Sequence, residues 1–353
     1  MAVRAGWRTI ERSDNVPLHL KFLSVALLSS LAVLIGGSFA QAPKNAVNYT
    51  NPVYASDFPD PFVLRVGQTY YAYATNGGGA TIQLLRSSDL VDWVYGSDAF
   101  GNLPAWATPG WTWAPEVAVV PGGYAMYYTA RHTESQRQCI GVAFSKTPEG
   151  PFTDSSTEPL ICQLTEGGSI DASPFTDRDG SRYLYWKNDG NCCGQRTYLY
   201  AQRLSSDGLQ LTGAPKQLIY NSNAWEGNLI EAPTMYRRND KYYLFFSAAD
   251  YGNETYGVGY AYGYSPLGPF TKWPTPILSS AGPVAGPGHQ CVIEDAKGRP
   301  WMVYHAWQSG NTGYPNGQRS LRIDLMTFKD GVPNVKPTTT RQASPNAGAS
   351  GAK

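Results

Sequence analysis

The feature that most constrains the fold of this chain is a motif that occurs five times. In each copy a polar residue precedes an apolar segment, a turn containing Gly, Asn or Asp follows, and the next segment is dense in Tyr, Phe or Trp. The leading residues, separated by 56, 55, 60 and 58 positions, are Asp60, Glu116, Asp171, Glu231 and His289. A regular period of this length is typical of repeat architectures.

The repeat predicts an all-β fold, a five-bladed β-propeller. One unit of this length holds about four short strands, and five units placed radially hide their sheet edges between neighbouring blades. The first strand of each blade then lines the central axis, so the five leading side chains are predicted to surround a single site. A β-sandwich, with the same residues at the starts of surface strands, is the alternative, but a sandwich gives no reason for a constant period.

The composition agrees with many short strands joined by turns. Of the 353 residues, 42% are hydrophobic and 13% aromatic, and the chain has 37 glycines and 26 prolines. We expect a single catalytic propeller over residues 41–336. Residues 337–353 lack a periodic apolar pattern and are rich in Thr, Ser, Ala, Gly and Pro, which predicts a disordered tail. We expect a monomer.

Residues 1–40 predict a signal peptide and therefore a secreted, extracellular protein. An apolar stretch over residues 22–39 follows Lys21 and leads to a small-x-small cleavage site after Ala40. A membrane anchor is the alternative. Cleavage removes four basic and two acidic residues, so the net charge changes from +1 to −1. A nearly neutral surface argues against nucleic acid or an anionic membrane as partner. Sequons at Asn48 and Asn253 fit secretion.

Acidic side chains gathered at the mouth of a narrow channel are costly, because each disfavours the ionisation of its neighbours. Three carboxyl groups in different surroundings can divide the work of glycoside cleavage: an ionised base, a protonated acid, and a group that orients the acid. Keeping an acid protonated near neutral pH requires a raised pKa, and each unit corresponds to ~1.4 kcal/mol. The acidic leading residues of the repeat are Asp60, Glu116, Asp171 and Glu231.

The residues around these positions resemble the motifs of glycoside hydrolase family 43 from about Asn51 to Pro333. In order, the matching segments are Phe58-Pro-Asp-Pro61, Trp113-Ala-Pro-Glu116, Ser169-Ile-Asp-Ala-Ser-Pro-Phe175, Ile230-Glu-Ala-Pro233 and Gly288-His-Gln290. The resemblance implies an inverting enzyme on a five-bladed propeller. It also implies Asp60 as general base, Asp171 as the residue that tunes and orients the acid, and Glu231 as general acid.

Each of these carboxylates has a rival close by in the sequence. Asp57 competes with Asp60, Asp177 and Asp179 compete with Asp171, and Glu226 competes with Glu231. The position in the repeat and the motif match favour the first-named role in every case. Asp177 and Asp179 belong to an Asp-Arg-Asp-Gly sequence, which predicts a solvent-exposed hairpin turn.

Four residues are candidates for substrate binding: Trp113, Glu116, His289 and Arg319. Trp113 is either a platform on which a sugar stacks or part of the core between blades. Glu116 either binds sugar hydroxyls or satisfies backbone groups. The resemblance implies that His289 lies beneath the pocket, and it leaves open whether His289 is a ligand of a structural calcium; the chemistry itself requires no cofactor. Arg319 resembles an arginine that reaches into the family's pocket, with a strand-surface arginine as the alternative.

The five cysteines have no spacing typical of a zinc or haem site. Secretion makes disulfides the default state. Cys139 and Cys162 flank one stretch between the second and third repeats and are predicted to pair. A bond between the adjacent Cys192 and Cys193 needs a strained eight-membered ring and stays open. Cys291 then remains free and buried.

Together, these features and the resemblance predict a secreted hydrolase acting on plant cell-wall arabinan or arabinoxylan. We expect it to release L-arabinofuranosyl or D-xylosyl units. The alternatives are an endo-arabinanase and a catalytically inactive carbohydrate-binding propeller. A fructan-cleaving propeller would carry an Asn-Asp-Pro-Asn-Gly signature, which is absent. Loops at 76–112, 187–197 and 248–257 are expected to decide the sugar and the choice between exo and endo action.

Overall fold

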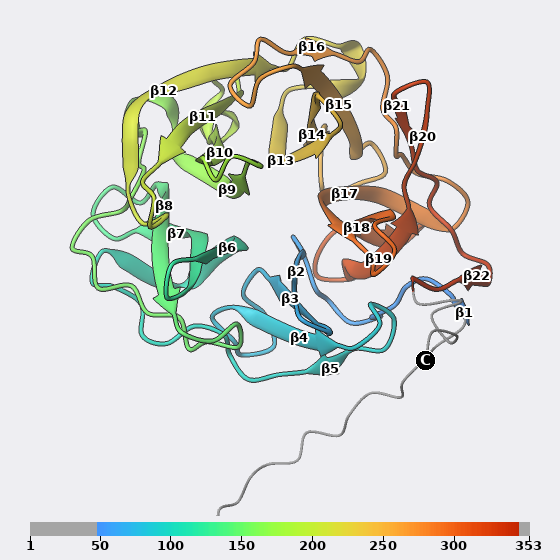
Figure 1. Cartoon of the computed structure of the whole chain (residues 1–353), viewed down its shortest axis with the longest axis horizontal. Helices are drawn as coiled ribbons and strands as arrows, with labels where there is room; N and C mark the ends of the chain where they lie inside the picture. The colour runs from blue at the N-terminus through green and yellow to red at the C-terminus, as the bar shows by residue number, and fades with distance from the viewer. Residues whose placement is uncertain (1–47, 346–353) are drawn as a thin grey trace, which may run out of the picture. The chain divides into compact units, whose positions relative to one another are not determined.

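The computed structural model describes residues 48–345, which form five antiparallel sheets around a central axis (Figure 1). Blade 1 contains β2 (Phe62–Val66), β3 (Thr69–Ala74), β4 (Gln83–Ser87) and β5 (Val94–Tyr95), and blade 2 contains β6 (Ala107–Val120), β7 (Gly123–His132) and β8 (Gln138–Ser145). Blade 3 contains β9 (Ser169–Thr176), β10 (Arg182–Asn188), β11 (Tyr198–Leu204) and β12 (Leu211–Tyr220). Blade 4 contains β13 (Ile230–Arg238), β14 (Lys241–Ala248), β15 (Gly257–Gly263) and β16 (Thr271–Lys272), and blade 5 contains β17 (Val284–Glu294), β18 (Pro300–Gln308) and β19 (Ser320–Leu325). The predicted five-bladed β-propeller is confirmed.

The remaining regular structure is small. Across residues 48–345 the chain forms three short 3-10 helices and no α-helix: η1 (Leu164–Glu166), η2 (Gly190–Cys193) and η3 (Ala224–Glu226). A short hairpin of β20 (Thr327–Lys329) and β21 (Val332–Asn334) follows blade 5. Within the same described part we find no helix with the length and apolar character needed to cross a membrane. The predicted signal peptide, residues 1–40, lies outside the described residues.

The aromatic strands of the repeat are explained by burial on both faces. In β14, Tyr243 and Phe245 pack with side chains of blade 5, whereas Leu244 and Phe246 pack with side chains of blade 3. Successive side chains of a strand point to opposite faces, so a strand between two neighbouring blades needs apolar residues at every position. The described residues form five buried clusters of this kind, one at each contact between neighbouring blades. The core therefore forms a ring between the blades.

A left-handed residue occurs in the inner strand of every blade or, in blade 1, just before it. The five residues with positive φ at these places are Asp60 (57°), Ala114 (44°), Asp171 (58°), Ala232 (50°) and His289 (48°). In blades 2 to 5 this residue is the first of two residues on the first strand that face a single residue of the second, so the pairing shifts by one residue. Non-glycine residues adopt this conformation at a cost of about 1–3 kcal/mol each, so the surrounding structure must hold it in place.

The backbone N–H of four of these residues is held by a side chain from the second strand of the preceding blade. The pairs are Thr75 Oγ1 with Ala114 N (2.9 Å), Thr129 Oγ1 with Asp171 N (3.2 Å), Ser247 Oγ with His289 N (2.8 Å) and His305 Nδ1 with Asp60 N (3.0 Å). The equivalent side chain between blades 3 and 4 is Lys187, which has no acceptor atom. There, the N–H of Ala232 donates to Asp171 Oδ2 at 3.0 Å instead.

The positions of the five left-handed residues correct the alignment of the repeats. The sequence aligned Glu116 and Glu231 with the other leading residues, but the structural equivalents are Ala114 and Ala232. Glu116 therefore lies two residues beyond the common position, and Glu231 one residue before it. The discrepancy arises because polar residues were used to align the repeats, whereas the backbone bulge sets the register of each blade.

The N-terminal segment completes blade 5 and joins the two ends of the described chain. Tyr54 bridges Leu321 of β19, and the side-chain amide of Asn51 bonds both backbone groups of Ile323. Strand β1 (Asn48–Tyr49) pairs with β22 (Gln342–Ala343). The prediction that a disordered tail begins at residue 337 is therefore wrong for residues 337–345. That segment is ordered by long-range pairing, which its composition did not signal.

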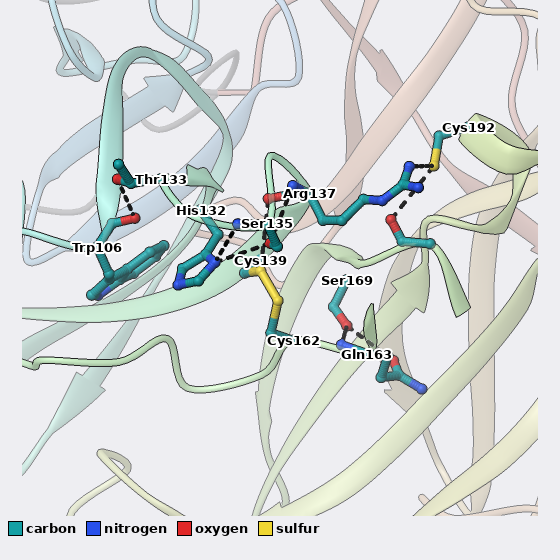
Figure 2. Close-up of a disulfide and its surroundings, with 11 residues drawn as sticks. Trp106, His132, Thr133, Ser135, Arg137, Cys139, Cys162, Gln163, Ser169 and Cys192 are labelled. Atoms are coloured by element: carbon teal, nitrogen blue, oxygen red, sulfur yellow. Dashed lines mark hydrogen bonds between the residues drawn. A yellow bond between two sulfur atoms is a disulfide. The ribbon is translucent and has the colours of Figure 1, made fainter. Parts of the chain in front are cut away.

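The predicted bond between Cys139 and Cys162 is confirmed, with Cα atoms 4.7 Å apart (Figure 2). It ties the start of β8 to the segment that leads into blade 3. Cys192 and Cys193 are also bonded to each other, and Cys291 is free and buried, as predicted. Figure 2 shows Arg137, two residues before Cys139, reaching toward Cys192.

The ring of hydrogen bonds between blades can be tested at Thr129. Thr129→Val keeps the shape of the side chain but leaves the N–H of Asp171 buried without its acceptor. We expect a loss of about 1–3 kcal/mol in the free energy of unfolding, measured by chemical denaturation. Thr271→Val, at an exposed position of β16, is the control and should change the same quantity by less than ~0.5 kcal/mol. Equal effects of the two substitutions would contradict a structural role for the ring.

Candidate active site

A pocket of about 900 Å³ opens at the axis and draws residues from all five blades. One residue from each blade, in chain order, is Asp60, Trp113, Asp171, Glu231 and His289. The inner strands β2, β6, β9, β13 and β17 surround the centre of the propeller in Figure 1. Residues spread over about 230 positions of sequence are thus brought to one place by the repeat, and Arg319 lines the same pocket.

Asp60 is surrounded by donors and cations. Its Oδ1 lies 2.8 Å from Arg319 Nη1 and 3.2 Å from His289 Nδ1, and its Oδ2 accepts from Thr75 Oγ1 at 2.5 Å. Burial alone would raise the pKa of Asp60, but Arg319, followed by His289, holds that pKa well below its ordinary value. Asp60 is therefore ionised at neutral pH.

Arg319 reaches the pocket and is fixed there. Its Nε donates to Tyr314 Oη at 3.2 Å, and its backbone N–H donates to Asp57 at 2.8 Å. Its guanidinium also lies over the rings of Tyr251 and Tyr314, at 5.1 and 5.5 Å. The alternative of a strand-surface arginine is wrong, since only 7% of Arg319 is exposed.

Asp171 links two blades through the carboxylate. Its Oδ2 accepts from the backbone N–H of Ala232, the residue directly after Glu231. Burial raises the pKa of Asp171, and the charges of Glu231 and Asp60 raise it further, against the opposing effects of His289 and Lys187. Asp171 therefore binds its proton more readily than Asp60, although both occupy the same backbone position in their blades.

Glu231 is held at both carboxylate oxygens. Tyr256 Oη donates to Oε1 at 2.7 Å, and Lys187 Nζ lies 3.3 Å from Oε2. Lys187 is fully buried and also lies 3.6 Å from Asp189. Tyr256 packs so closely on Gly288 that a Cβ at that glycine would come within 2.1 Å of the ring. The two supports of Glu231 thus come from blade 3 and from the loop between β14 and β15.

The comparisons with known proteins agree with this geometry. The sequence profile of "Glycosyl hydrolases family 43" matches residues 49–333. The chain belongs to this family. A solved structure described as a thermostable family-43 glycoside hydrolase superposes with a TM-score of 0.77 at 34% sequence identity, covering 84% of this chain and 99% of that one. The enzyme is therefore a family 43 hydrolase on the propeller fold of that family.

Two curated relatives extend the comparison. The β-D-galactofuranosidase XynD of Aspergillus niger is 29% identical, over 88% of this chain and 94% of its own length. The extracellular endo-α-(1→5)-L-arabinanase 1 of Bacillus subtilis is 26% identical, over 78% of this chain and 86% of its own length. The family thus includes relatives named for different sugars and for different modes of action.

The structure distinguishes Asp60, Asp171 and Glu231 from the acidic residues near them in the sequence, because each of those residues has partners of its own. Glu226 is buried against Lys272 at 2.5 Å and caps η3, so it has a structural partner away from the pocket. Asp177 is half-buried, not solvent-exposed as expected, because it accepts from Arg237 and Tyr242 of blade 4. Asp57 does line the pocket, but it accepts from Tyr314 and from the backbone of Arg319.

Of the predicted binding residues, Glu116 is not brought to the pocket. It is buried two residues beyond Ala114 on the inner strand, and burial raises its pKa well above the ordinary value despite a hydrogen bond with Ser173. Glu116 therefore lies buried outside the pocket beside Ser173 of blade 3, and neither of its two predicted roles is confirmed. Trp113 is half-buried in the pocket wall, with its ring centroid 6.0 Å from that of Trp111.

The donors around His289 do not by themselves make a calcium site. Its Nδ1 faces Asp60, and among residues 48–345 no three His, Cys, Asp or Glu side chains gather as metal ligands. Calcium prefers six to eight oxygen ligands. A calcium at His289 stays a prediction of the family resemblance, and the chemistry derived below uses no metal.

Lys187 and Tyr256 are the site residues that the sequence analysis missed. Lys187 follows the aromatic run of the third repeat, where the other repeats have Thr75, Thr129, Ser247 and His305. When the second strands of the repeats are aligned, Lys187 is the one residue at this position whose side chain cannot accept a hydrogen bond. This difference could have marked it as a functional candidate. Tyr256 lies in the loop 248–257, which was expected to influence the choice of sugar, but no pattern singled out this residue.

The ion pair of Asp60 makes stability depend on pH. Because the pKa of Asp60 is lowered in the folded state, its ionised form stabilises the fold above pH ~4, and the effect is lost as the pH falls further. Asp60→Asn leaves Arg319 buried without its carboxylate partner. We expect a loss of about 3–5 kcal/mol in the free energy of unfolding at pH 7, and a difference from wild type that narrows below pH ~4.

Asp179→Asn, in an exposed turn, is the matched control for this experiment and should behave as wild type throughout. Chemical denaturation at several pH values measures the loss in the free energy of unfolding at pH 7 and how that loss changes at lower pH. A stability difference for Asp60→Asn that stays constant down to pH ~2 would contradict the assignment of an ionised, cation-held Asp60.

Proposed function

We propose that this enzyme is a secreted, inverting glycoside hydrolase that releases L-arabinofuranosyl units from plant cell-wall arabinan or arabinoxylan. The observation that carries the proposal is the contrast between Asp60, ionised beside Arg319, and Glu231, held by Tyr256 on the other side of one pocket. Two carboxyl groups in different surroundings are what acid–base cleavage of a glycoside requires, and inversion is the outcome that the family resemblance implies. Secretion is supported by the predicted signal peptide and by disulfides, which persist in oxidising compartments.

The proposed reaction takes place in one step. Asp60 removes a proton from water as the water oxygen attacks the anomeric carbon, while Glu231 transfers its proton to the departing glycosidic oxygen. Asp171, bonded to the backbone next to Glu231, orients the acid and favours its protonated form by its own charge. Asp60 then returns its proton to solvent and Glu231 takes one up, so the protons balance over a turnover.

The furanosyl preference is supported by the chemistry of the relatives' sugars. One relative is named a β-D-galactofuranosidase and another an α-L-arabinanase. β-D-Galactofuranosides and α-L-arabinofuranosides share the configuration of the furanose ring and differ in the exocyclic chain. A pocket shaped for that ring is therefore compatible with both names. Release of D-xylosyl units, as in the xylosidases of this family, is the competing exo activity.

An endo-acting arabinanase is the second candidate. Several relatives are named arabinan endo-1,5-α-L-arabinosidases, and Trp111, at the pocket wall, is 42% exposed and could extend a binding surface along a polymer. Products from linear arabinan distinguish the two modes: free arabinose from the start indicates exo action, and mixed oligosaccharides indicate endo action. No hydrolysis of arabinofuranosides, xylosides or arabinan would favour a binding protein.

The catalytic roles can be tested with two substitutions and one spectrum. Proton NMR of the first product should show inverted anomeric configuration; retained configuration would refute the mechanism. Glu231→Gln should lose most activity on oligosaccharides, roughly 10²–10⁴-fold, and much less on 4-nitrophenyl glycosides, whose leaving group needs little acid assistance. Asp60→Asn should fail on both substrates, because the attacking water still needs a base.

Two further substitutions should move the pH profile in opposite directions. A general acid acts while protonated, so the alkaline limb of kcat/KM reports the loss of its proton. Asp171→Asn removes a negative charge near the proposed acid and should shift that limb to lower pH. Lys187→Met removes a positive charge near the proposed acid and should shift the limb to higher pH. Shifts in the same direction, or none, would exclude Glu231 as the general acid.

A further inference from the structure

The bond between Cys192 and Cys193 lies in the wall of the catalytic pocket. Cys192 lines the pocket together with Asp189 and Asn191, all in the connection between β10 and β11. We propose that this disulfide is a binding contact for the sugar unit on the leaving-group side of the cleaved bond. The inference rests on the proposed glycosidase function and names a subsite of that same pocket.

The exposed position of the disulfide at the pocket mouth indicates which sugar unit of a bound chain it contacts. Cys192 is exposed, whereas Asp60, Asp171 and Glu231 are largely buried on the pocket floor. The sugar that is cleaved must reach the floor, where its anomeric carbon meets the carboxylates. A contact at the exposed mouth therefore meets the next unit of the chain.

The position of the disulfide around the axis indicates the same side. Its connection follows Lys187 closely and includes Asp189, and Lys187 lies 3.3 Å from Glu231 Oε2. Asp60, the proposed base, belongs to blade 1 and carries the attacking water. The proton donor and the departing oxygen lie on the Glu231 side, so a wall element next to that support borders the leaving group.

The disulfide is held rigidly enough to act as a binding surface. Two adjacent bonded cysteines form an eight-membered ring that restricts the backbone, and Gly194 after them adopts the left-handed conformation that ends η2. Arg137 Nη1 lies 2.7 Å from Cys193 Sγ and 3.3 Å from Cys192 Sγ. Figure 2 shows the contact with Cys192. Arg137 itself is anchored beside β8, whose residue Cys139 is bonded to Cys162.

The chemistry of the contact suits a sugar ring. Disulfide sulfur is uncharged and polarisable and accepts hydrogen bonds only weakly, so it favours the C–H face of a ring over its hydroxyl groups. Trp111 and Trp113 of blade 2 contribute indole rings to the same pocket, which suit the same kind of face. Neither surface requires a particular pattern of hydroxyl groups, so the subsite would accept either a main-chain arabinose or a xylose as leaving group.

The experiment compares two kinds of ligand in the double variant Cys192→Ser/Cys193→Ser. Free L-arabinose, as an inhibitor, occupies the pocket floor only, and arabinotriose also occupies the mouth. We expect the KM for arabinotriose to rise about 10-fold, with the inhibition constant of arabinose unchanged within about 2-fold. Arg137→Gln, which retains the disulfide but loosens its support, should raise the same KM by a smaller factor.

A reversible form of the test covers the case in which the double variant does not fold. A dithiol reductant transfers two electrons to the disulfide, giving two cysteine thiols and the cyclic disulfide of the reductant. The exposed Cys192–Cys193 bond should react first, because Cys139 is wholly buried. The KM for arabinotriose should rise on reduction and return on reoxidation, with two thiols counted per chain under native conditions.

The results that would contradict the subsite differ from the result that would contradict the proposed function. An unchanged KM with lowered stability would mean that the disulfide is only structural. A parallel rise of the KM and the arabinose inhibition constant would place its effect on the pocket floor. Either result overturns the subsite. A wild-type enzyme that hydrolyses neither arabinooligosaccharides nor xylooligosaccharides would instead refute the proposed function.

Discussion

The fold and the site both depend on one hydrogen bond that recurs around the axis. One residue within or just before the inner strand of each blade adopts a left-handed backbone conformation, and in four blades its N–H donates to a side chain of the preceding blade. The conformation turns the inner strand at the pocket. The hydrogen bond fixes how neighbouring blades stand relative to each other. Asp60, Asp171 and His289 occupy this position, so the contact that assembles the blades also places functional side chains.

The exception to this ring of hydrogen bonds lies between blades 3 and 4, beside Glu231. Lys187 occupies the acceptor position between blades 3 and 4 and cannot accept, so Asp171 takes the N–H of Ala232 through its carboxylate. That bond ties Asp171 to the strand that carries Glu231. It also leaves the lysine ammonium available to Glu231 and Asp189. At this position Lys187 thus contributes an ion pair with Glu231, where the other blades have a hydrogen bond to the backbone of the next blade.

The sequence predicted the blades and the three carboxylates, because burial on both faces imposes aromatic strands at a constant period and the family motifs surround the acids. It did not predict the register of Glu116 and Glu231. A bulge is decided by which backbone groups find partners, and side-chain type alone does not reveal it. Tyr256 and the pairing of β22 with β1 were missed for a related reason. Both depend on contacts between segments far apart in the chain, which leave no local pattern.

Three carboxyl groups buried together need nearby cations to compensate their negative charge. These cations are distributed unevenly among the three groups, and this makes the groups differ. Arg319, itself buried and bound by Tyr314, acts on Asp60, so that carboxylate stays charged. Lys187 contacts Glu231 but is shared with Asp189. Asp171 has neither cation in direct contact and binds its proton more readily. Because a buried charge is tolerated only when it is paired, the placement of Arg319 keeps Asp60 charged, whereas Asp171, buried without such a contact, holds its proton more readily.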